Sequence, residues 1–314
     1  MRRLALLAAC AALAAAPAAA AAARIELGVH GSPPYFDRLT GQHTSIVHVF
    51  IGFDQADGVR QVIANMGPEP MLALVPGSYG SHETASPRAI ALGATDAFLF
   101  ALNASIAAAP VHRFYLRPFP EMNGWWEAES AYNRNGSPRD AAHTTAWVKK
   151  AFARIAVIER GGTQSAVSAK LRTLGLPGVL ADLAPTGAKL RIVWNPQGYG
   201  SPDLPGNSAA AYYPGDAYVD VVGDDLYDIG GHGATWAAAQ ALYDAHPSKP
   251  FAFPEWGLWG IDDPSFVEQM ASFVHTHRRI VFISYYDGGP GKVWDLASKP
   301  KSLAAYRRLI DPLA

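Results

Sequence analysis

The stretch from Arg117 to Trp126, which reads R-P-F-P-E-M-N-G-W-W, gathers side chains that could do chemistry. It supplies a carboxylate at Glu121, an amide at Asn123 and the indole of Trp126 close together in the chain. A carboxylate can transfer a proton, and an indole offers a flat apolar face beside one polar N–H group. These groups suit a site that binds a sugar and cleaves its linkage, provided that the chain supplies a second carboxylate.

Glu255 is the candidate for that second carboxylate. It follows the apolar run 250–254 and is itself followed by Trp256. Glycoside hydrolysis that retains the anomeric configuration uses two carboxyls about 5–5.5 Å apart, whereas an inverting pair stands about 6.5–9.5 Å apart. Both spacings are compatible with the sequence, and we expect the retaining arrangement with Glu121 and Glu255 as the pair.

The two carboxylates need different surroundings if they are to play different roles. A general acid must be protonated at the working pH, so burial and a neighbouring carboxylate must raise its pKa. The indole of Trp126 could desolvate Glu121 in this way. A nucleophile must stay ionised, and hydrogen-bond donors such as Tyr227 and Arg117 favour that state for Glu255.

Eight short apolar runs have the length and composition of strands, and helical spacing or a long crossover separates consecutive runs. The expected strands are 24–30, 45–51, 71–75, 111–116, 189–194, 218–223, 250–254 and 280–286, and the main expected helices are 54–65, 89–108, 141–159, 235–246, 263–277 and 301–310. This alternation predicts an α/β fold, a single-domain (β/α)8 TIM barrel. An open doubly wound sheet is the alternative, but the chain has no dinucleotide-binding or P-loop glycine motif.

The ends of the expected strands collect acids, amides and aromatic residues, whereas their interiors are apolar. Active sites of such barrels lie at the C-terminal face of the strands, so these residues are candidates for a common site. Besides the residues already named, the candidates for substrate contact include His30, Trp256 and Tyr285. No histidine pair has metal-ligand spacing such as H-E-x-x-H, and we expect neither a metal nor a cofactor.

Three segments resemble the sequence patterns of glycoside hydrolase family 26, which belongs to clan A. Arg117–Trp126 is similar to the acid/base motif of that family, Gly223-Asp-Asp-Leu-Tyr227 to its sixth-strand pattern, and Lys249-Pro-Phe-x-x-x-Glu255-Trp-Gly257 to its nucleophile strand. The segments occur in the family's order and cover much of the chain. The family contains β-mannanases and some β-1,3-xylanases and β-glucanases.

The resemblance implies a role for six residues of the chain. Glu121 would be the acid/base and Glu255 the nucleophile, and Tyr227 would hydrogen-bond the nucleophile. Arg117 and Asn123 would hold the −1 sugar and the carboxylates, and Trp126 would stack on sugars in the glycone subsites.

Two positions depart from the family pattern. Pro120 stands where members commonly have a histidine before the acid/base glutamate, and the eighth strand ends in Tyr285-Tyr286 rather than in the tryptophan often seen in the clan. A carbohydrate-binding protein that has lost its activity is therefore a second hypothesis. A third is a hydrolase that trims an exopolysaccharide of the cell that makes it.

The first 23 residues have the pattern of a signal peptide. Arg2 and Arg3 form a positive start, residues 4–16 are apolar, and an alanine-rich stretch with A-x-A sites runs to Ala23. The single cysteine, Cys10, lies in this segment, and its lipidation is the alternative to simple secretion. Without the segment the chain has no cysteine, hence no disulfide and no thiol chemistry.

The composition fits a soluble globular protein, because 49% of the 314 residues are hydrophobic and 17% are charged. The slightly acidic balance favours neither nucleic acid nor an anionic membrane. We therefore expect residues 24–314 to form the catalytic domain of a secreted, monomeric, retaining glycoside hydrolase. Its expected partner is a β-linked polysaccharide, first β-mannan and next β-1,3-xylan or β-glucan, attacked in exo or endo fashion.

Overall fold

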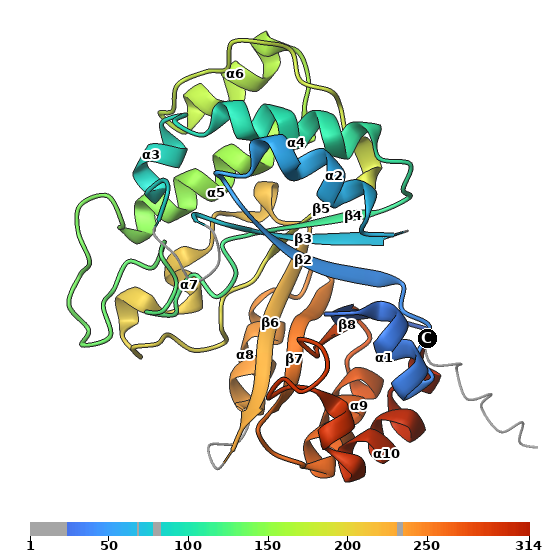
Figure 1. Ribbon diagram of the computed structural model, residues 1–314. Helices are drawn as coiled ribbons and strands as arrows, with labels where there is room; N and C mark the ends of the chain where they lie inside the picture. The colour runs from blue at the N-terminus through green and yellow to red at the C-terminus, as the bar shows by residue number, and fades with distance from the viewer. Residues whose placement is uncertain (1–23, 68, 78–82, 231–234) are drawn as a thin grey trace, which may run out of the picture.

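The computed structural model describes residues 24–67, 69–77, 83–230 and 235–314. The predicted signal peptide lies outside these residues. Eight parallel strands follow one another around a closed barrel in chain order, which confirms the predicted (β/α)8 fold (Figure 1). The strands are β1 (Glu26–His30), β2 (Ile46–Gly52), β3 (Glu69–Val75), β4 (Phe114–Pro118), β5 (Leu190–Trp194), β6 (Val221–Ile229), β7 (Phe251–Trp259) and β8 (Ile280–Tyr286).

Helices lie outside the strands and cover the barrel (Figure 1). Within the described residues these are α1 (Pro33–Thr40), α2 (Val59–Ala64), α3 (Pro87–Ala91), α4 (Asp96–Ala108), α5 (Thr145–Arg160), α6 (Gln164–Thr173), α7 (Ala209–Tyr212), α8 (Trp236–Ala245), α9 (Pro264–Thr276) and α10 (Pro300–Leu309). The long helix α5 begins where the Thr144 side chain accepts a hydrogen bond from the Trp147 N–H. None of the helices in the described part of the chain is long and apolar enough to cross a bilayer.

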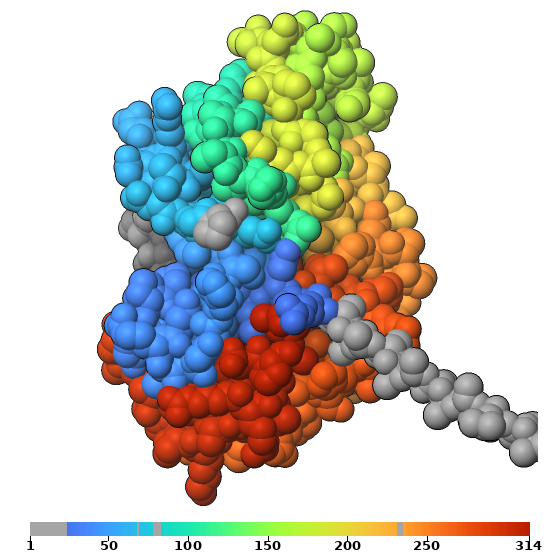
Figure 2. Space-filling view, turned by 90° about the vertical axis from the view of Figure 1, so that its right-hand side faces the viewer, coloured from blue at the N-terminus to red at the C-terminus, as the bar shows by residue number. Residues whose placement is uncertain are grey.

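The two ends of the described chain meet at the barrel. The Ile25 N–H donates to the Leu313 carbonyl at 3.0 Å, and β1 pairs with β8 so that Gly28 lies opposite Ser284. Figure 2 shows the blue N-terminal segment packed directly against the red C-terminal segment. The last elements of the chain therefore complete both the barrel and the layer of helices around it.

The prediction of one helix over 89–108 is wrong, because the structure has two helices, α3 and α4, with a break between them. Gly93 in the break has a φ of 93°, a left-handed conformation that glycine adopts at little cost. The space beside it is filled by an ion pair in which the Arg154 Nε donates to the Asp96 Oδ1 at 2.9 Å. The apolar periodicity of the segment continues through the break, so it did not reveal the turn.

Strands β6 and β7 run farther than the predicted segments 218–223 and 250–254. They remain paired beyond these points, with Asp225 opposite Glu255 and Ile229 opposite Trp259. Pro254 is accommodated because the register of β7 against β8 shifts between Phe253 and Trp256. The extension places the predicted nucleophile and its neighbours on strands, which hold side chains more rigidly than loops.

The interior of the barrel changes from apolar to polar along the strands. Ile46 of β2, Tyr115 of β4 and Val193 of β5 belong to one buried apolar cluster. Side chains two positions apart on a strand point to the same face. The same face therefore carries polar groups one step nearer the C-terminal ends of the strands, namely His48, Arg117 and Asn195, all buried.

Candidate active site

Arg117 is the centre of a polar network at the C-terminal end of the barrel. Its guanidinium is fully buried and donates from Nη1 to the Glu255 Oε1 at 2.5 Å, from Nη2 to Asp225 and from Nε to Asn195. These partners come from β6, β7 and the end of β5, so a single side chain of β4 ties four neighbouring strands together. A buried arginine with such partners keeps its positive charge in the site.

Glu255 receives hydrogen bonds on both carboxylate oxygens. The Tyr227 Oη donates to Oε2 at 2.7 Å, and Arg117 holds Oε1. The Glu255 N–H in turn donates to the Asp225 carboxylate at 3.0 Å, which fixes the backbone under the side chain. Donors that point at both oxygens stabilise the ionised carboxylate, the state that a nucleophile requires.

Glu121 lies just after β4 in an unusual backbone segment. Phe119 and Glu121, with φ values of 54° and 52°, are the two non-glycine residues of the described chain with positive φ, and Pro120 stands between them. Such conformations cost about 1–3 kcal/mol each and persist where the surroundings enforce them. The Glu121 N–H donates to the Asn195 carbonyl at 2.9 Å, which holds the turn against the end of β5.

The carboxyl group of Glu121 has different surroundings from that of Glu255. The Trp126 Nε1 donates to its Oε2 at 2.7 Å, and the Gln197 Nε2 donates to its Oε1 at 2.9 Å. Burial, followed by repulsion from Glu255, raises the pKa of Glu121, while the two hydrogen bonds act in the opposite direction. A raised pKa keeps more of this carboxyl protonated near neutral pH, as a general acid requires.

Both carboxyl groups line one cavity of about 310 Å³. Aromatic and apolar side chains form most of its wall. The cavity is lined by Phe50, Pro120, Glu121, Trp126, Glu127, Tyr227, Ile229, Glu255, Trp259, Tyr286 and Trp294.

Exposed indole faces stand at two sides of this cavity. Trp126 is 42% exposed and Trp259 is 43% exposed, although both are large apolar side chains. Trp259 packs edge-on against Tyr227 and Trp294, with ring centroids 6.1 and 5.0 Å away, so its position is fixed by other rings. Flat, held indole faces beside polar groups are suited to pyranose rings, which are apolar on their C–H side.

The structure brings together five of the nine predicted site residues: Glu121, Glu255, Arg117, Tyr227 and Trp126. A sixth, His30, lies near the edge of the site without lining the cavity. Its ring stacks on Tyr286 at a centroid distance of 4.3 Å, and its Nδ1 lies 3.1 Å from the His48 carbonyl oxygen. Burial lowers the pKa of His30, which favours the neutral ring.

Trp256 and Tyr285 do not line the cavity, so the structure does not bring them together with the other predicted site residues. Both are fully buried, and the two rings pack against each other and against Tyr306 of α10. Successive side chains of a strand point to opposite faces. Because Glu255 and Tyr286 face the cavity, their strand neighbours Trp256 and Tyr285 face the surrounding helices.

Asn123 is likewise buried and acts on the backbone of a neighbouring loop. Its Nδ2 donates to the carbonyls of Gln197 and Tyr199, and its Oδ1 accepts from the Gln197 N–H at 2.8 Å. Its side chain therefore holds the loop that carries the Gln197 side chain toward Glu121. The expected direct contact with a sugar is not supported by this position.

Sequence reasoning missed four residues that line the cavity: Phe50, Glu127, Ile229 and Trp294. Glu127 follows Trp126 directly, so its place next to a candidate motif was the available signal. Trp294 comes eight residues after Tyr286 in an irregular segment, where no periodicity pointed to the site. Among the residues that the structure describes, no group of three histidine, cysteine, aspartate or glutamate side chains could hold a metal ion.

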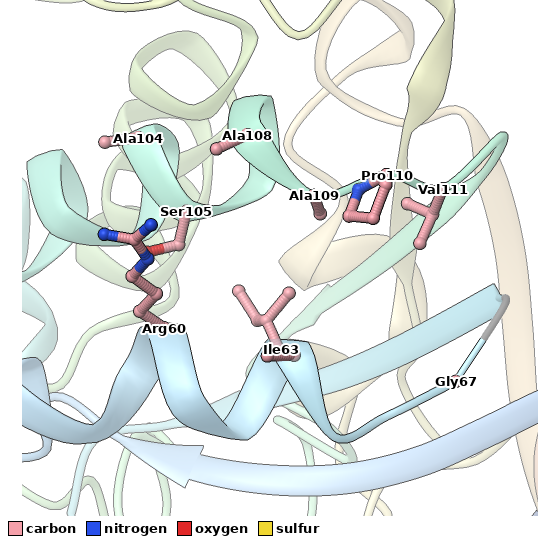
Figure 3. Close-up of a pocket in the computed structure, with 10 residues that line it drawn as sticks. Arg60, Ile63, Gly67, Ala104, Ser105, Ala108, Ala109, Pro110 and Val111 are labelled. Atoms are coloured by element: carbon pink, nitrogen blue, oxygen red, sulfur yellow. The ribbon is translucent and has the colours of Figure 1, made fainter.

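A larger cavity, of about 540 Å³, lies elsewhere on the barrel. Figure 3 shows Arg60 and Ile63 of α2 pointing toward α4. On the α4 side, the wall of the cavity is made of Ala104, Ser105 and Ala108. The rest of its wall belongs to the segments that lead into β3 and β4, at the opposite ends of these strands from Glu121. Since no carboxylate is found among the described residues that line it, this cavity is not a candidate for the chemistry described above.

The barrel and the carboxyl pair at its C-terminal end define the class of protein: a (β/α)8 barrel with an acidic, aromatic-walled site. Solved structures with the same fold include a Bacillus subtilis mannanase (18% identity, TM-score 0.55, covering 92% of this chain and 87% of that chain). They also include a family 26 β-mannanase from Bacteroides ovatus (14%, TM-score 0.58, covering 92% and 88%).

A third similar structure is a β-mannanase from a symbiotic protist of the termite Reticulitermes speratus, in complex with a gluco-manno-oligosaccharide (16%, TM-score 0.53, covering 91% and 86%). Identities this low show a shared fold. The family that these structures represent is the one that the three sequence segments resemble. No sequence-family model matches the chain, and no curated protein sequence matches it.

Proposed function

We propose that this protein is a secreted, retaining glycoside hydrolase that cleaves a β-linked polysaccharide. The observation that carries the proposal is the unequal pair in one cavity. Glu255 has donors on both oxygens, whereas burial and the neighbouring carboxyl raise the pKa of Glu121. Acid-assisted displacement requires two carboxyl groups in different environments, one that can donate a proton and one that can attack as a carboxylate.

In the proposed reaction, the ionised Glu255 attacks the anomeric carbon while Glu121 gives its proton to the departing glycosidic oxygen. The bond to the leaving sugar breaks, and a glycosyl ester forms on Glu255. A water molecule then gives a proton to Glu121 and attacks the same carbon, which releases the sugar and restores both carboxyls. Tyr227 and Arg117 orient Glu255 throughout.

β-Mannan is the first substrate that we propose. The similar solved structures are described as mannanases, and one of them binds a gluco-manno-oligosaccharide. The exposed indoles of Trp126 and Trp259 give the cavity flat faces for a chain of pyranose rings. β-1,3-Xylan and β-glucan follow, and the same chemistry would serve for a self-made exopolysaccharide.

The proposal predicts that Glu121→Ala and Glu255→Ala each abolish most of the activity. Positioned acid–base groups contribute about 10²- to 10⁴-fold to a rate, so release of reducing sugar from β-mannan should fall by at least about 10². Glu268→Ala, which removes an exposed carboxylate from α9, is the control and should leave the rate unchanged. Hydrolysis at the wild-type rate by either variant would contradict the proposal.

A carbohydrate-binding protein without turnover is the second candidate, and Pro120 is the observation that favours it. This residue lines the cavity directly before Glu121, and its ring offers no hydrogen bond to a sugar. Binding of a polysaccharide by the intact protein, with no product released from β-mannan, β-1,3-xylan or β-glucan, would support this candidate over the hydrolase.

A further inference from the structure

A third carboxyl group lines the cavity beside the two described above. Glu127 belongs to the segment that follows β4, and its side chain is half-buried. Within the described residues, no donor makes a hydrogen bond or an ion pair with its carboxylate. This distinguishes it from Glu121 and Glu255, each of which has protein donors on both oxygens.

Neither a lysine nor an arginine is found among the described residues that line the cavity, so none of these residues balances the charge of Glu127. The Arg117 guanidinium is already shared between Asp225 and Glu255, and its Nε is bonded to Asn195. The Arg139 guanidinium donates to backbone carbonyls, including that of Glu127 at 2.8 Å, and not to the Glu127 carboxylate. A carboxylate that is partly removed from water and lacks a donor is costly, so a ligand that supplies one should bind well.

The walls of the cavity restrict what such a ligand can be. The exposed indoles of Trp126 and Trp259 and the side chain of Ile229 present apolar surface around the carboxyls. Flat faces suit sugar rings, and charge-assisted hydrogen bonds to a carboxylate are about twice as strong as neutral ones. A sugar that carries an ammonium group satisfies both features, whereas a sugar that carries a carboxylate is repelled.

We propose that Glu127 is a specificity determinant, which makes the cavity prefer glycans with free amino groups. This inference rests on the proposed glycoside hydrolase function. The residue contacts the ammonium group of a bound hexosamine unit. Neutral glycans bind the same cavity more weakly, and glycans with uronic acid units bind most weakly.

The pKa of Glu127 provides an additional readout. Burial, followed by repulsion from Glu129, Glu121 and Glu255, raises this pKa well above its ordinary value. In mildly acidic buffer part of the free protein therefore carries a proton on Glu127. An ammonium ligand favours the ionised carboxylate, so its binding should release protons, and binding of a matched neutral sugar should release fewer.

The test compares two β-1,4-linked oligomers of equal length, one of glucosamine and one of glucose, which differ only in the amine or hydroxyl at C2. Thio-linked analogues resist hydrolysis, so titration calorimetry can measure their binding to the intact protein in buffers of different ionisation enthalpy. We expect the glucosamine oligomer to bind about tenfold more tightly, the strength of one charge-assisted hydrogen bond over a neutral one. Added salt should reduce the difference.

Glu127→Gln should abolish the preference and the proton release, because it removes the charge and keeps the shape of the side chain. Glu268→Gln, on the exposed face of α9, should keep both. Equal affinities in the wild-type protein, or a preference that persists in Glu127→Gln, would overturn the inference.

Hydrolysis of neutral β-mannan, measured in parallel, separates this inference from the proposed function. A wild-type protein that hydrolyses β-mannan without preferring the glucosamine oligomer keeps the proposed function and loses the role of Glu127. A protein that neither binds these oligomers nor hydrolyses any glycan loses both.

Discussion

At the scale of single residues, the hydrogen bond from Tyr227 orients the Glu255 carboxylate. The Tyr227 hydroxyl reaches the Oε2 at 2.7 Å, on the oxygen that Arg117 does not hold. The bond holds the carboxylate in one orientation toward the cavity. If Glu255 is the nucleophile, the loss of this donor should slow the reaction more than it weakens substrate binding.

Tyr227→Phe is therefore expected to lower kcat about ten- to a hundredfold with little change in KM. A buried carboxylate that loses a hydrogen bond forfeits about 1–3 kcal/mol. Steady-state kinetics on β-mannan measure the effect. Tyr243→Phe, on the outer helix α8, is the matched control. Equal losses in both variants would show that the Tyr227 hydroxyl has no special role.

The pH dependence of the rate is set by Glu121 on its alkaline side, because a general acid stops working when it loses its proton. The hydrogen bond from Gln197 stabilises the ionised form of Glu121 and thus lowers its pKa. Gln197→Ala removes this bond, so the pKa should rise and the alkaline limb of the kcat/KM profile should move to higher pH. Gln164→Ala, in the distant helix α6, should leave the profile unchanged, and a shift of the Gln197→Ala limb to lower pH would refute the assignment.

Among the elements, the break between α3 and α4 is held by an ion pair between the buried Arg154 and the partly exposed Asp96. Arg154 of α5 is fully buried and makes a two-pronged contact with Asp96, and its Nη1 also donates to the Pro177 carbonyl at 2.7 Å. Removal of one partner from such a pair leaves an uncompensated charge in the protein.

Arg154→Ala should lower the free energy of unfolding by about 2 kcal/mol, because the Pro177 carbonyl loses its donor and the partly exposed Asp96 loses its partner. Denaturant unfolding measures this change. Arg308→Ala breaks an exposed pair with Glu268 and should cost less than about 1 kcal/mol. Comparable losses for the two variants would contradict the role given to the Arg154 contact.

The extension of β6 and β7 shows how far the sequence could define the elements. Short runs of apolar and β-branched residues located all eight strands, because parallel strands buried on both faces are continuous apolar runs. The predicted ends of β6 and β7 were too early, because the apolar runs end at Gly223 and Pro254 while the paired strands continue. Asp225 and Glu255 are tolerated on the continued strands because the interior of the barrel is polar there.

On the scale of the whole molecule, the sequence predicted the barrel and the carboxyl pair. Glu121 and Glu255 could be paired in advance because the barrel topology brings the C-terminal ends of all strands to one face. The side from which Trp256 and Tyr285 project could not be predicted, because it depends on a register that the sequence leaves open. Glu127 and Trp294 were missed because they lie in irregular segments, where only the folded chain shows which side chains converge.

As the proposed nucleophile, Glu255 becomes covalently attached to the sugar during the reaction. Incubation of the protein with a panel of 2-deoxy-2-fluoro glycosides bearing a good leaving group, followed by mass spectrometry of its peptides, tests this directly. We predict that one glycosyl unit will be found on the peptide that contains Glu255, and that Glu255→Gln will remain unlabelled. A label on Glu121, or turnover of a glycan with inversion at the anomeric carbon, would contradict the account.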